Sequence, residues 1–449
     1  MSFAFRKKVG VPRFSPDQTR LLVVLTLVNF VNYLDRQLIF PLFSLIREDF
    51  ALSYFQVGWL AAAFSIIHAL GAVPLGMLAD RTSRKRVISY ALLFWSGATF
   101  LSGLANSFRS LLVARGLVGM GEAAYAPAAT AIISGTFARR VRARVQGVFD
   151  TGMFVGGAVG LALGGILADG MGWRPAFFIV GIPGLLLGLT IVRLPETPGE
   201  SGAKSIPILQ LLRVPAFVAV LAGGLFVTFA GNVYVIWGTE FLRRFKGFGL
   251  GEAGISLGVV AVAAGILGVT TGAVLADRLA GMFPWGRVLT ICAGFLVSAP
   301  FILWALHTPG KAAFLGLFFL GSFFMSWYYG PVTATIHDLV PARAHATAMG
   351  VYCFFVNFFA TTLAPTVIGK IADRYDLLTG MHTAVAAQVA GGLCFFVVIY
   401  CIRGHGLRHP ALAQVPDEPG LAAGGEDEPL PGRPALPWPE TPPAPAPCL

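Results

Sequence analysis

Charged residues are what this sequence has least of. Lys, Arg, Asp and Glu make up 12% of its 449 residues, whereas soluble domains carry about 25%. Hydrophobic residues make up 56%, so there is too little polar surface to cover a soluble domain. The composition excludes a cytosolic enzyme, a disordered chain and a disulfide-rich secreted scaffold. It indicates a membrane protein.

Cysteines and phosphate-binding motifs are also scarce. The five cysteines have neither the spacing of a disulfide framework nor that of a zinc site. No Gly-Lys-Ser/Thr loop is present to cradle a phosphate, so ATP-driven pumping is unsupported. We therefore expect no cofactor, no metal, no catalytic residue and no enzymatic activity. The net charge of +11 is typical of basic cytoplasmic loops, and we expect no nucleic-acid partner.

Twelve apolar runs are long enough to cross the roughly 30 Å hydrocarbon core, which takes about 20 residues each. Backbone groups in lipid must bond within their own segment, so each run is expected to be a helix. The predicted fold is an all-α membrane protein with twelve transmembrane helices in two six-helix bundles. The helices are expected at about 21–43, 57–79, 87–106, 109–135, 145–168, 175–193, 215–240, 253–276, 287–306, 312–336, 346–369 and 382–402.

The basic residues predict the orientation of these helices. Counting from the N-terminus, the loops on one face carry 21 Lys and Arg and those on the other face carry 9. Basic loops stay on the cytoplasmic side, so both termini are predicted to be cytoplasmic, in a cell membrane that is the inner membrane in a bacterium. The first 20 residues lack the short apolar core of a cleavable signal, so the first helix is expected to remain in the membrane.

Composition also predicts the domain boundaries. A cytoplasmic segment at 1–20 precedes the first bundle at 21–193, and a polar linker at 194–214 leads to the second bundle at 215–402. The tail at 403–449 is rich in Pro and cannot bury a core, so we expect it to be disordered.

The two halves repeat each other. Leu78-Ala79-Asp80-Arg81 recurs as Leu275-Ala276-Asp277-Arg278, and Leu167-Ala168-Asp169 recurs as Ile371-Ala372-Asp373. The same Ala-Asp ending thus closes helices two, five, eight and eleven, which implies two inverted three-helix units in each half. This pattern is typical of major facilitator transporters, whose substrate site lies at the midplane between the halves.

Several segments resemble the major facilitator superfamily, and within it the Spinster branch. They are the loop motif from Gly76 to Arg86, Asn32-Tyr33-Leu34-Asp35-Arg36, Trp95-Ser96, Ala114-Arg115-Gly116, Gly119 to Ala123, Gly172-Trp173-Arg174, Gly181 to Gly184, Leu339-Val340-Pro341 and Ala346-Thr347-Ala348. The resemblance implies export of amphipathic lipids, such as lysophospholipids or sphingoid phosphates, coupled to protons. Symporters of sugar acids share the Asn-Tyr-x-Asp-Arg motif, so an organic-anion symporter of the same fold remains an alternative.

Five charged residues lie deep in the predicted membrane: Asp150, and the four on helices one and four, which are Asp35, Arg36, Arg115 and Glu122. A charge at that depth costs at least about 2.5–3.5 kcal/mol, so such residues are kept for pairing or for function. Movement of an arginine toward or away from a carboxylate would change its proton affinity, which predicts a proton-coupling role for all four. The alternative is a permanent ion pair that only locks helices one and four together.

Polar residues on the predicted helices indicate where a substrate binds. Asn29, Asn32, Tyr33 and Arg36 fall within about 100° of one another on helix one. A guanidinium such as that of Arg115 matches a phosphate or carboxylate in bidentate geometry. A charged wall and an aromatic wall together favour an amphipathic substrate. The predicted substrate-binding residues are Asn32, Tyr33, Arg115, Glu122, Asp150, Asn232, Tyr234, Trp237, Tyr328 and Asn357.

A gate is expected where helices two and eight end. The resemblance implies that Asp80, Arg81 and Arg84 form contacts that break when the carrier opens inward, and the repeat extends this role to Asp277 and Arg278. The alternative is a solvated loop that only sets topology.

These features predict a secondary-active, proton-coupled transporter of an anionic amphipathic molecule that works by alternating access. Its expected partners are the substrate, protons and the lipid bilayer, and we expect a monomer. A membrane receptor or scaffold without flux is the alternative from a different class.

Overall fold

The structure, a computed structural model, describes residues 14–137, 139–191, 208–341 and 344–405. Within these ranges every regular element is a helix. The α-helices are α1 (Pro16–Asp49), α2 (Tyr54–Arg81), α3 (Arg84–Gly103), α4 (Phe108–Ala123), α5 (Tyr125–Thr136), α6 (Arg139–Met171), α7 (Trp173–Ile191), α8 (Ile208–Leu211), α9 (Pro215–Lys246), α10 (Leu250–Ala280), α11 (Gly286–His307), α12 (Lys311–Met325), α13 (Tyr329–Leu339), α14 (His345–Arg374) and α15 (Leu377–His405), with a 3₁₀ turn, η1 (Ser326–Tyr328), between α12 and α13.

The predicted all-α architecture is confirmed, with two of the predicted helices interrupted. The run predicted at 109–135 is divided into α4 and α5, and the run predicted at 312–336 into α12, η1 and α13. Pro127 and Pro331 lie just after the two breaks. A proline has no N–H for the carbonyl four residues earlier, and its ring clashes with that carbonyl, so a helix breaks there.

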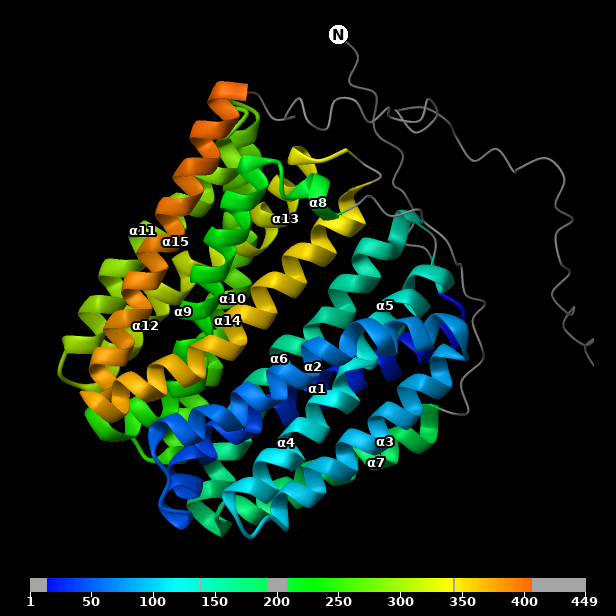
Figure 1. Ribbon diagram of the computed structural model, residues 1–449, viewed down its shortest axis with the longest axis vertical. Helices are drawn as coiled ribbons and strands as arrows, with labels where there is room; N and C mark the ends of the chain where they lie inside the picture. The colour runs from blue at the N-terminus through cyan, green and yellow to red at the C-terminus, as the bar shows by residue number, and fades with distance from the viewer. Residues whose placement is uncertain (1–13, 138, 192–207, 342–343, 406–449) are drawn as a thin grey trace, which may run out of the picture.

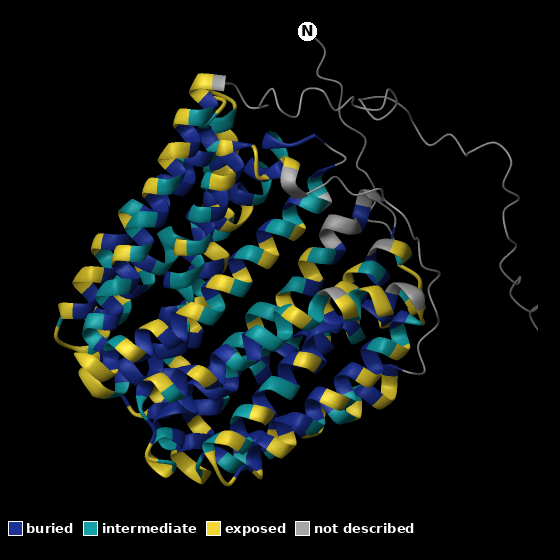
Figure 2. Ribbon diagram, in the orientation of Figure 1, coloured by how far each residue is buried: buried dark blue, intermediate teal, exposed yellow. Residues whose placement is uncertain are grey.

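The helices form two bundles that lie side by side (Figure 1). The first half runs from α1 to α7, and the second half runs from α9 to α15. Figure 2 shows buried residues inside each bundle and exposed ones along the outer helix faces. Many exposed side chains are large and apolar, including Tyr400, Trp304 and Leu70. Such a surface suits lipid, and ten helical segments among the described residues are long and apolar enough to cross a membrane.

A ladder of glycines in α6 brings this helix against α1. Gly152, Gly156, Gly160 and Gly164 recur every four residues, and a Cβ on any of them would lie 2.2–2.5 Å from a backbone oxygen of α1. Only a residue without a side chain permits this approach, as in other closely packed membrane helices. The ladder thereby fixes α1, which carries Asp35 and Arg36.

Because the spans alternate in direction, the molecule has two sides. We call the side that holds Pro16 and His405 the terminal side, and the side that holds Asp49 and Lys246 the far side. These names describe the chain and do not assign either side to a compartment.

On the far side, two aspartates join the halves, and we call them the far-side latches. Asp373, near the end of α14, accepts hydrogen bonds from the backbone nitrogens of Tyr54 and Phe55 at 2.7 and 2.9 Å. Asp169, near the end of α6, accepts one from the backbone nitrogen of Gly251 at 2.8 Å. The first N–H groups of a helix have no partner within it and attract negative charge, so each carboxylate caps a helix of the opposite half.

A third contact on the far side is centred on Glu240 of α9, which is buried. Its carboxylate pairs with Arg244 at 2.5 Å and accepts a hydrogen bond from the Tyr54 hydroxyl of α2 at 3.4 Å. The neighbouring Arg243 pairs with Glu48 of α1 at 2.7 Å. Trp237 packs against Phe43 and Tyr54, whose ring centroids lie 5.8 and 5.7 Å from its own. The far side is therefore closed.

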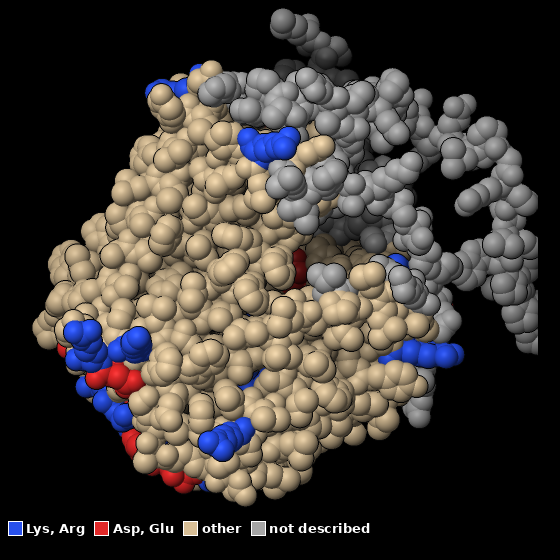
Figure 3. Space-filling model, in the orientation of Figure 1, with Lys and Arg blue, Asp and Glu red and all other residues tan. Residues whose placement is uncertain are grey.

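The space between the halves opens away from these far-side contacts. Figure 3 shows a hollow in the surface between the two bundles, with an acidic side chain inside it. A molecule closed at one side and hollowed between its halves has the shape of a carrier caught open to one compartment.

Candidate functional site

The centre of the site is an ion pair between α1 and α4. The Arg115 guanidinium lies 4.0 Å from the Asp35 carboxylate, and the two residues are 1% and 2% exposed. Thr99 of α3 donates a hydrogen bond to the other carboxylate oxygen. Asp35 Oδ1 and two of the Arg115 nitrogens, Nε and Nη1, complete no hydrogen bond within the described residues. The pair is therefore buried but incompletely satisfied.

Glu122 lies near the end of α4, just before the break between α4 and α5, and is 1% exposed. It interacts electrostatically with Asp35, Arg36 and Arg115, and Asn32 is a polar neighbour. Neither carboxylate oxygen, nor the Asn32 amide nitrogen, completes a hydrogen bond within the described ranges. A buried carboxylate without a completed hydrogen bond is costly, so this one needs a proton, a water molecule or a ligand.

Arg36 lies on the same helix as Asp35 but has a different environment. It is only partly buried, and its guanidinium carbon lies 4.8 Å from the centroid of the Phe64 ring and 5.8 Å from that of Tyr33. None of the ion pairs between described residues involves Arg36. It is a cation that lies against two aromatic rings, with the Glu122 carboxylate close enough to attract it.

Tyr33 links this cluster to the second half. It interacts electrostatically with Arg36, Glu122 and Asp150, and Tyr329 of α13 lies close enough to interact with it in turn. Asp150 is partly buried in α6, where it accepts a hydrogen bond from Gln146 at 3.0 Å. The charged cluster of the first half therefore borders the space between the halves.

The residues predicted in the second half are less closely grouped. Tyr234 is buried and donates a hydrogen bond to Gln388 at 3.2 Å inside its own bundle. Tyr328 is buried against Phe295. The amides of Asn232 and Asn357 bond to carbonyls of their own helices. The structure thus places Trp237 in the far-side closure and Tyr234 and Tyr328 in the bundle core.

The predicted gate is only partly described. The side chains of Asp80 and Arg81 lie outside the described residues. Arg84 is buried and reaches the Ala131 carbonyl at 3.5 Å. Asp277 and Arg278 are exposed, and Asp277 lies 3.6 Å from Arg287, which also bonds to Asp338 at 2.5 Å.

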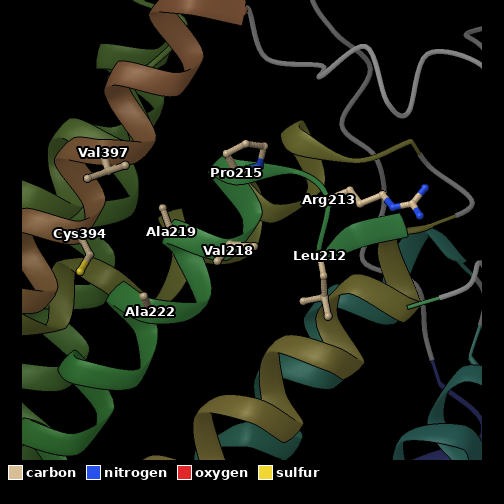
Figure 4. A pocket seen from close by; sticks show the side chains of 8 residues that line it. All are labelled: Leu212, Arg213, Pro215, Val218, Ala219, Ala222, Cys394 and Val397. Carbon is tan, nitrogen blue, oxygen red and sulfur yellow. The ribbon is translucent and has the colours of Figure 1, made fainter. Parts of the chain in front are cut away.

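A separate cavity of about 410 Å³ lies between α9 and α15, beside α8 (Figure 4). Its lining is apolar apart from Arg213, and none of the charged residues described above borders it. The cavity is formed by the second half and the residues just before α9, and its apolar lining differs from the charged candidate site. Its lining residues are Leu212, Arg213, Pro215, Val218, Ala219, Ala222, Cys394 and Val397.

Four features of the site and its closure were missed in the sequence. Thr99 and Phe64 carry no charge and look like ordinary residues of apolar helices. Glu240 falls at the end of a predicted helix, where a charge is unremarkable. The aspartates of the far-side latches were noticed only as repeat markers, although their position at matching helix ends was a usable signal.

The fold and the site together define a membrane carrier built of two six-span halves. The sequence profile of the Major Facilitator Superfamily matches residues 25–365. Since this is most of the chain, the protein belongs to that superfamily, and within it the chain is Spinster-like. Members of the superfamily are transporters, so the protein is a multi-pass membrane transporter of a small molecule and not an enzyme.

Three curated relatives are similar over most of their length. An MFS-type efflux pump of Mycolicibacterium smegmatis is 29% identical over 83% of this chain and 91% of its own. A hexuronate transporter of Bacillus subtilis is 27% identical, covering 87% and 95%. Protein spinster homolog 1 of Homo sapiens is 28% identical, covering 80% and 74%.

A solved structure agrees with the fold. The crystal structure of a bacterial homolog of the human lysosomal transporter Spinster, in an inward-facing and occupied conformation, has a TM-score of 0.79 and 25% identity. The match covers 87% of this chain and 99% of the other.

Proposed function

We propose that the protein is a proton-coupled carrier of an anionic amphipathic molecule, such as a lysophospholipid or a sphingoid phosphate, and that it works by alternating access. The observation that carries the proposal is the buried cluster of Asp35, Arg115 and Glu122, whose polar atoms are only partly satisfied. A permanent structural pair would be expected to complete its hydrogen bonds, because each unmade one is costly.

Protonation gives this cluster a mechanism. While Asp35 is ionised, it attracts the Arg115 guanidinium across 4.0 Å. A proton on Asp35 removes that attraction and releases Arg115 to bind an anion, which links proton binding to substrate binding. Glu122, close to both, is the second carboxylate that can take a proton. The proposed proton-coupling residues are therefore Asp35, Glu122, Arg36 and Arg115.

The amphipathic substrate is supported by the two different walls of the site. Arg36 and Arg115 provide positive charge on the first half, and exposed Tyr329 of the second half lies close enough to interact with Tyr33 beside them. The Spinster-like sequence points the same way. We propose further that the protein is a monomer, that both termini are cytoplasmic and that the space between the halves opens to the cytoplasm.

The proton role is tested with Asp35→Asn in proteoliposomes. Asn keeps the shape of Asp and can still accept from Thr99, but it cannot exchange a proton. We expect uptake driven by a pH gradient to fall at least about tenfold in protein that still inserts and folds, although loss of the Asp35 charge lowers its melting temperature. Transport that keeps the wild-type pH dependence would falsify the role of Asp35.

The second candidate is a symporter of sugar acids, favoured by the similarity to the hexuronate transporter of Bacillus subtilis. Competition between a lysophospholipid and a hexuronate for the purified protein separates the two candidates, since only the true substrate class should displace bound probe at low concentration. Counterflow in vesicles addresses the non-transporting receptor, because a receptor shows no exchange of labelled substrate.

A further inference from the structure

Phe64 of α2 has a ring that contacts both arginines of the site. The guanidinium carbons of Arg36 and Arg115 lie 4.8 and 5.3 Å from the centroid of its ring. Both distances fall within the roughly 6 Å range of cation–π attraction. The ring itself is 3% exposed, so water does not weaken this attraction.

Because both guanidinium groups lie over the same ring, their positive charges repel each other. The repulsion on Arg115 is offset by Asp35. Arg36 forms no ion pair among the described residues, although the Glu122 carboxylate interacts with it electrostatically, and its guanidinium lies against the rings of Phe64 and Tyr33. The Phe64 ring is the contact that both guanidinium groups share, and together with Glu122 it opposes the repulsion between their like charges.

The position of the ring is fixed by its own surroundings. A Cβ on Gly119 of α4 would lie 2.4 Å from the Phe64 carbonyl oxygen, so the backbones of α2 and α4 touch at this residue. On its own helix the ring lies nearly parallel to His68, with centroids 5.6 Å apart. A ring held in this way can define where the guanidinium groups lie.

We propose that Phe64 is a positioning residue, which holds Arg36 beside the Asp35–Arg115 pair so that both guanidinium groups reach one oxyanion of the substrate. Phosphate and carboxylate share the geometry that a guanidinium recognises, so either headgroup would fit. The role rests on the proposed function, because it assumes an anionic substrate in this site.

The test measures binding of three probes to the full-length protein in nanodiscs: lysophosphatidate, glucuronate and neutral monoacylglycerol. Phe64→Leu and Phe64→Met keep apolar bulk without a ring, and Phe64→Tyr keeps the ring. We expect the two ring-less variants to bind the preferred anionic probe about five- to thirtyfold more weakly. We expect them to bind monoacylglycerol within twofold of wild type, and Phe64→Tyr to stay near wild type for all probes.

The control is Phe177→Leu, which changes a fully buried phenylalanine of the same half that has no guanidinium among its described contacts. Wild-type affinity for the anionic probe in Phe64→Leu would overturn the positioning role, and so would an equal loss in Phe64→Tyr, since packing alone would then explain it. If Phe64→Leu weakens the binding of the anionic and the neutral probes equally, the positioning role is also overturned. A wild-type protein that does not distinguish anionic from neutral probes would instead refute the anion site of the proposed function, and the role of Phe64 with it.

Discussion

At the scale of single residues, the pairing of Asp35 with Arg115 makes a prediction about stability. Arg115→Met leaves a carboxylate buried without its cation, a change that costs about 3–5 kcal/mol in other proteins. We expect the melting temperature in detergent to fall strongly. The double variant Asp35→Asn, Arg115→Met should recover most of the loss, because a neutral Asn needs no cation.

Two observations check this prediction. Arg174→Met breaks an exposed pair with Asp49, so it should cost no more than about 1 kcal/mol. If the double variant instead loses as much stability as the two single changes added together, the two side chains do not interact in the folded protein.

Glu122 gives a prediction of the opposite sign. Its carboxylate oxygens complete no hydrogen bond within the described residues, so removing its charge removes a buried cost. We expect Glu122→Gln to melt at or above the wild-type temperature at neutral pH, while pH-driven transport is lost. Functional sites commonly have lower stability than the fold allows, because activity requires residues that destabilise it. A clear fall in melting temperature would assign Glu122 to the structure of the bundle instead.

Residue chemistry also explains which parts of the site could be predicted. Asp35, Arg115 and Glu122 stand out because a charge in an apolar run is rare and expensive. Phe64 and Thr99 do not stand out, since aromatic and hydroxyl side chains are ordinary in such helices. Their importance depends on a neighbouring helix, and helix spacing along the chain does not give that neighbour.

At the scale of elements, the glycine ladder of α6 predicts a sharp contrast between adjacent positions. A Cβ at Gly156 would lie 2.2 Å from the Phe30 carbonyl oxygen, whereas one at Gly157 meets nothing closer than Gln37 Cγ at 3.6 Å. We expect Gly156→Ala to force α1 and α6 apart, at a cost of about 1–3 kcal/mol. Gly157→Ala should be neutral or slightly stabilising, since Ala favours the helix.

The measurement for both glycine variants is the yield and melting temperature of the monodisperse protein. Equal behaviour of Gly156→Ala and Gly157→Ala would contradict the packing of α1 on α6. The change at Gly156 should also lower transport, because α1 positions Asp35 and Arg36.

Element boundaries show the limits of hydropathy. All twelve predicted runs are helical, but α1 extends to Asp49 and α9 to Lys246, beyond the apolar runs at 21–43 and 215–240. The extra turns are polar because they leave the hydrocarbon, and the contact between Glu48 and Arg243 lies within them. Hydropathy locates the part of a helix in lipid, while the contacts between the halves form where the helices emerge.

At the scale of the whole molecule, the repeat predicted two pseudo-symmetric halves but not which side is closed. A carrier that alternates between two shapes has one sequence for both, so the sequence alone does not select the state. Two of the repeated Ala-Asp endings, at Asp169 and Asp373, cap helices of the opposite half on the far side. We propose that these contacts break when that side opens.

The far-side latches therefore predict a shift between conformations. Asp169→Asn with Asp373→Asn weakens both caps without adding bulk, because a neutral amide binds a helix N-terminus less well than a carboxylate. We expect the population open on the far side to rise several-fold, seen as a longer distance between spin labels at Asn106 and Pro309 in a cysteine-free background. The matched control is Asp376→Asn, because Asp376 lies in the loop between α14 and α15, close to Asp373 in the chain. Asp376 accepts a hydrogen bond at 2.6 Å from the backbone nitrogen of Thr379 in the same half, and this bond holds its pKa below the usual range. That control should leave the distribution of spin-label distances unchanged. An unchanged distribution in the double variant would contradict the prediction, because the latches would then cap helices without holding the halves together.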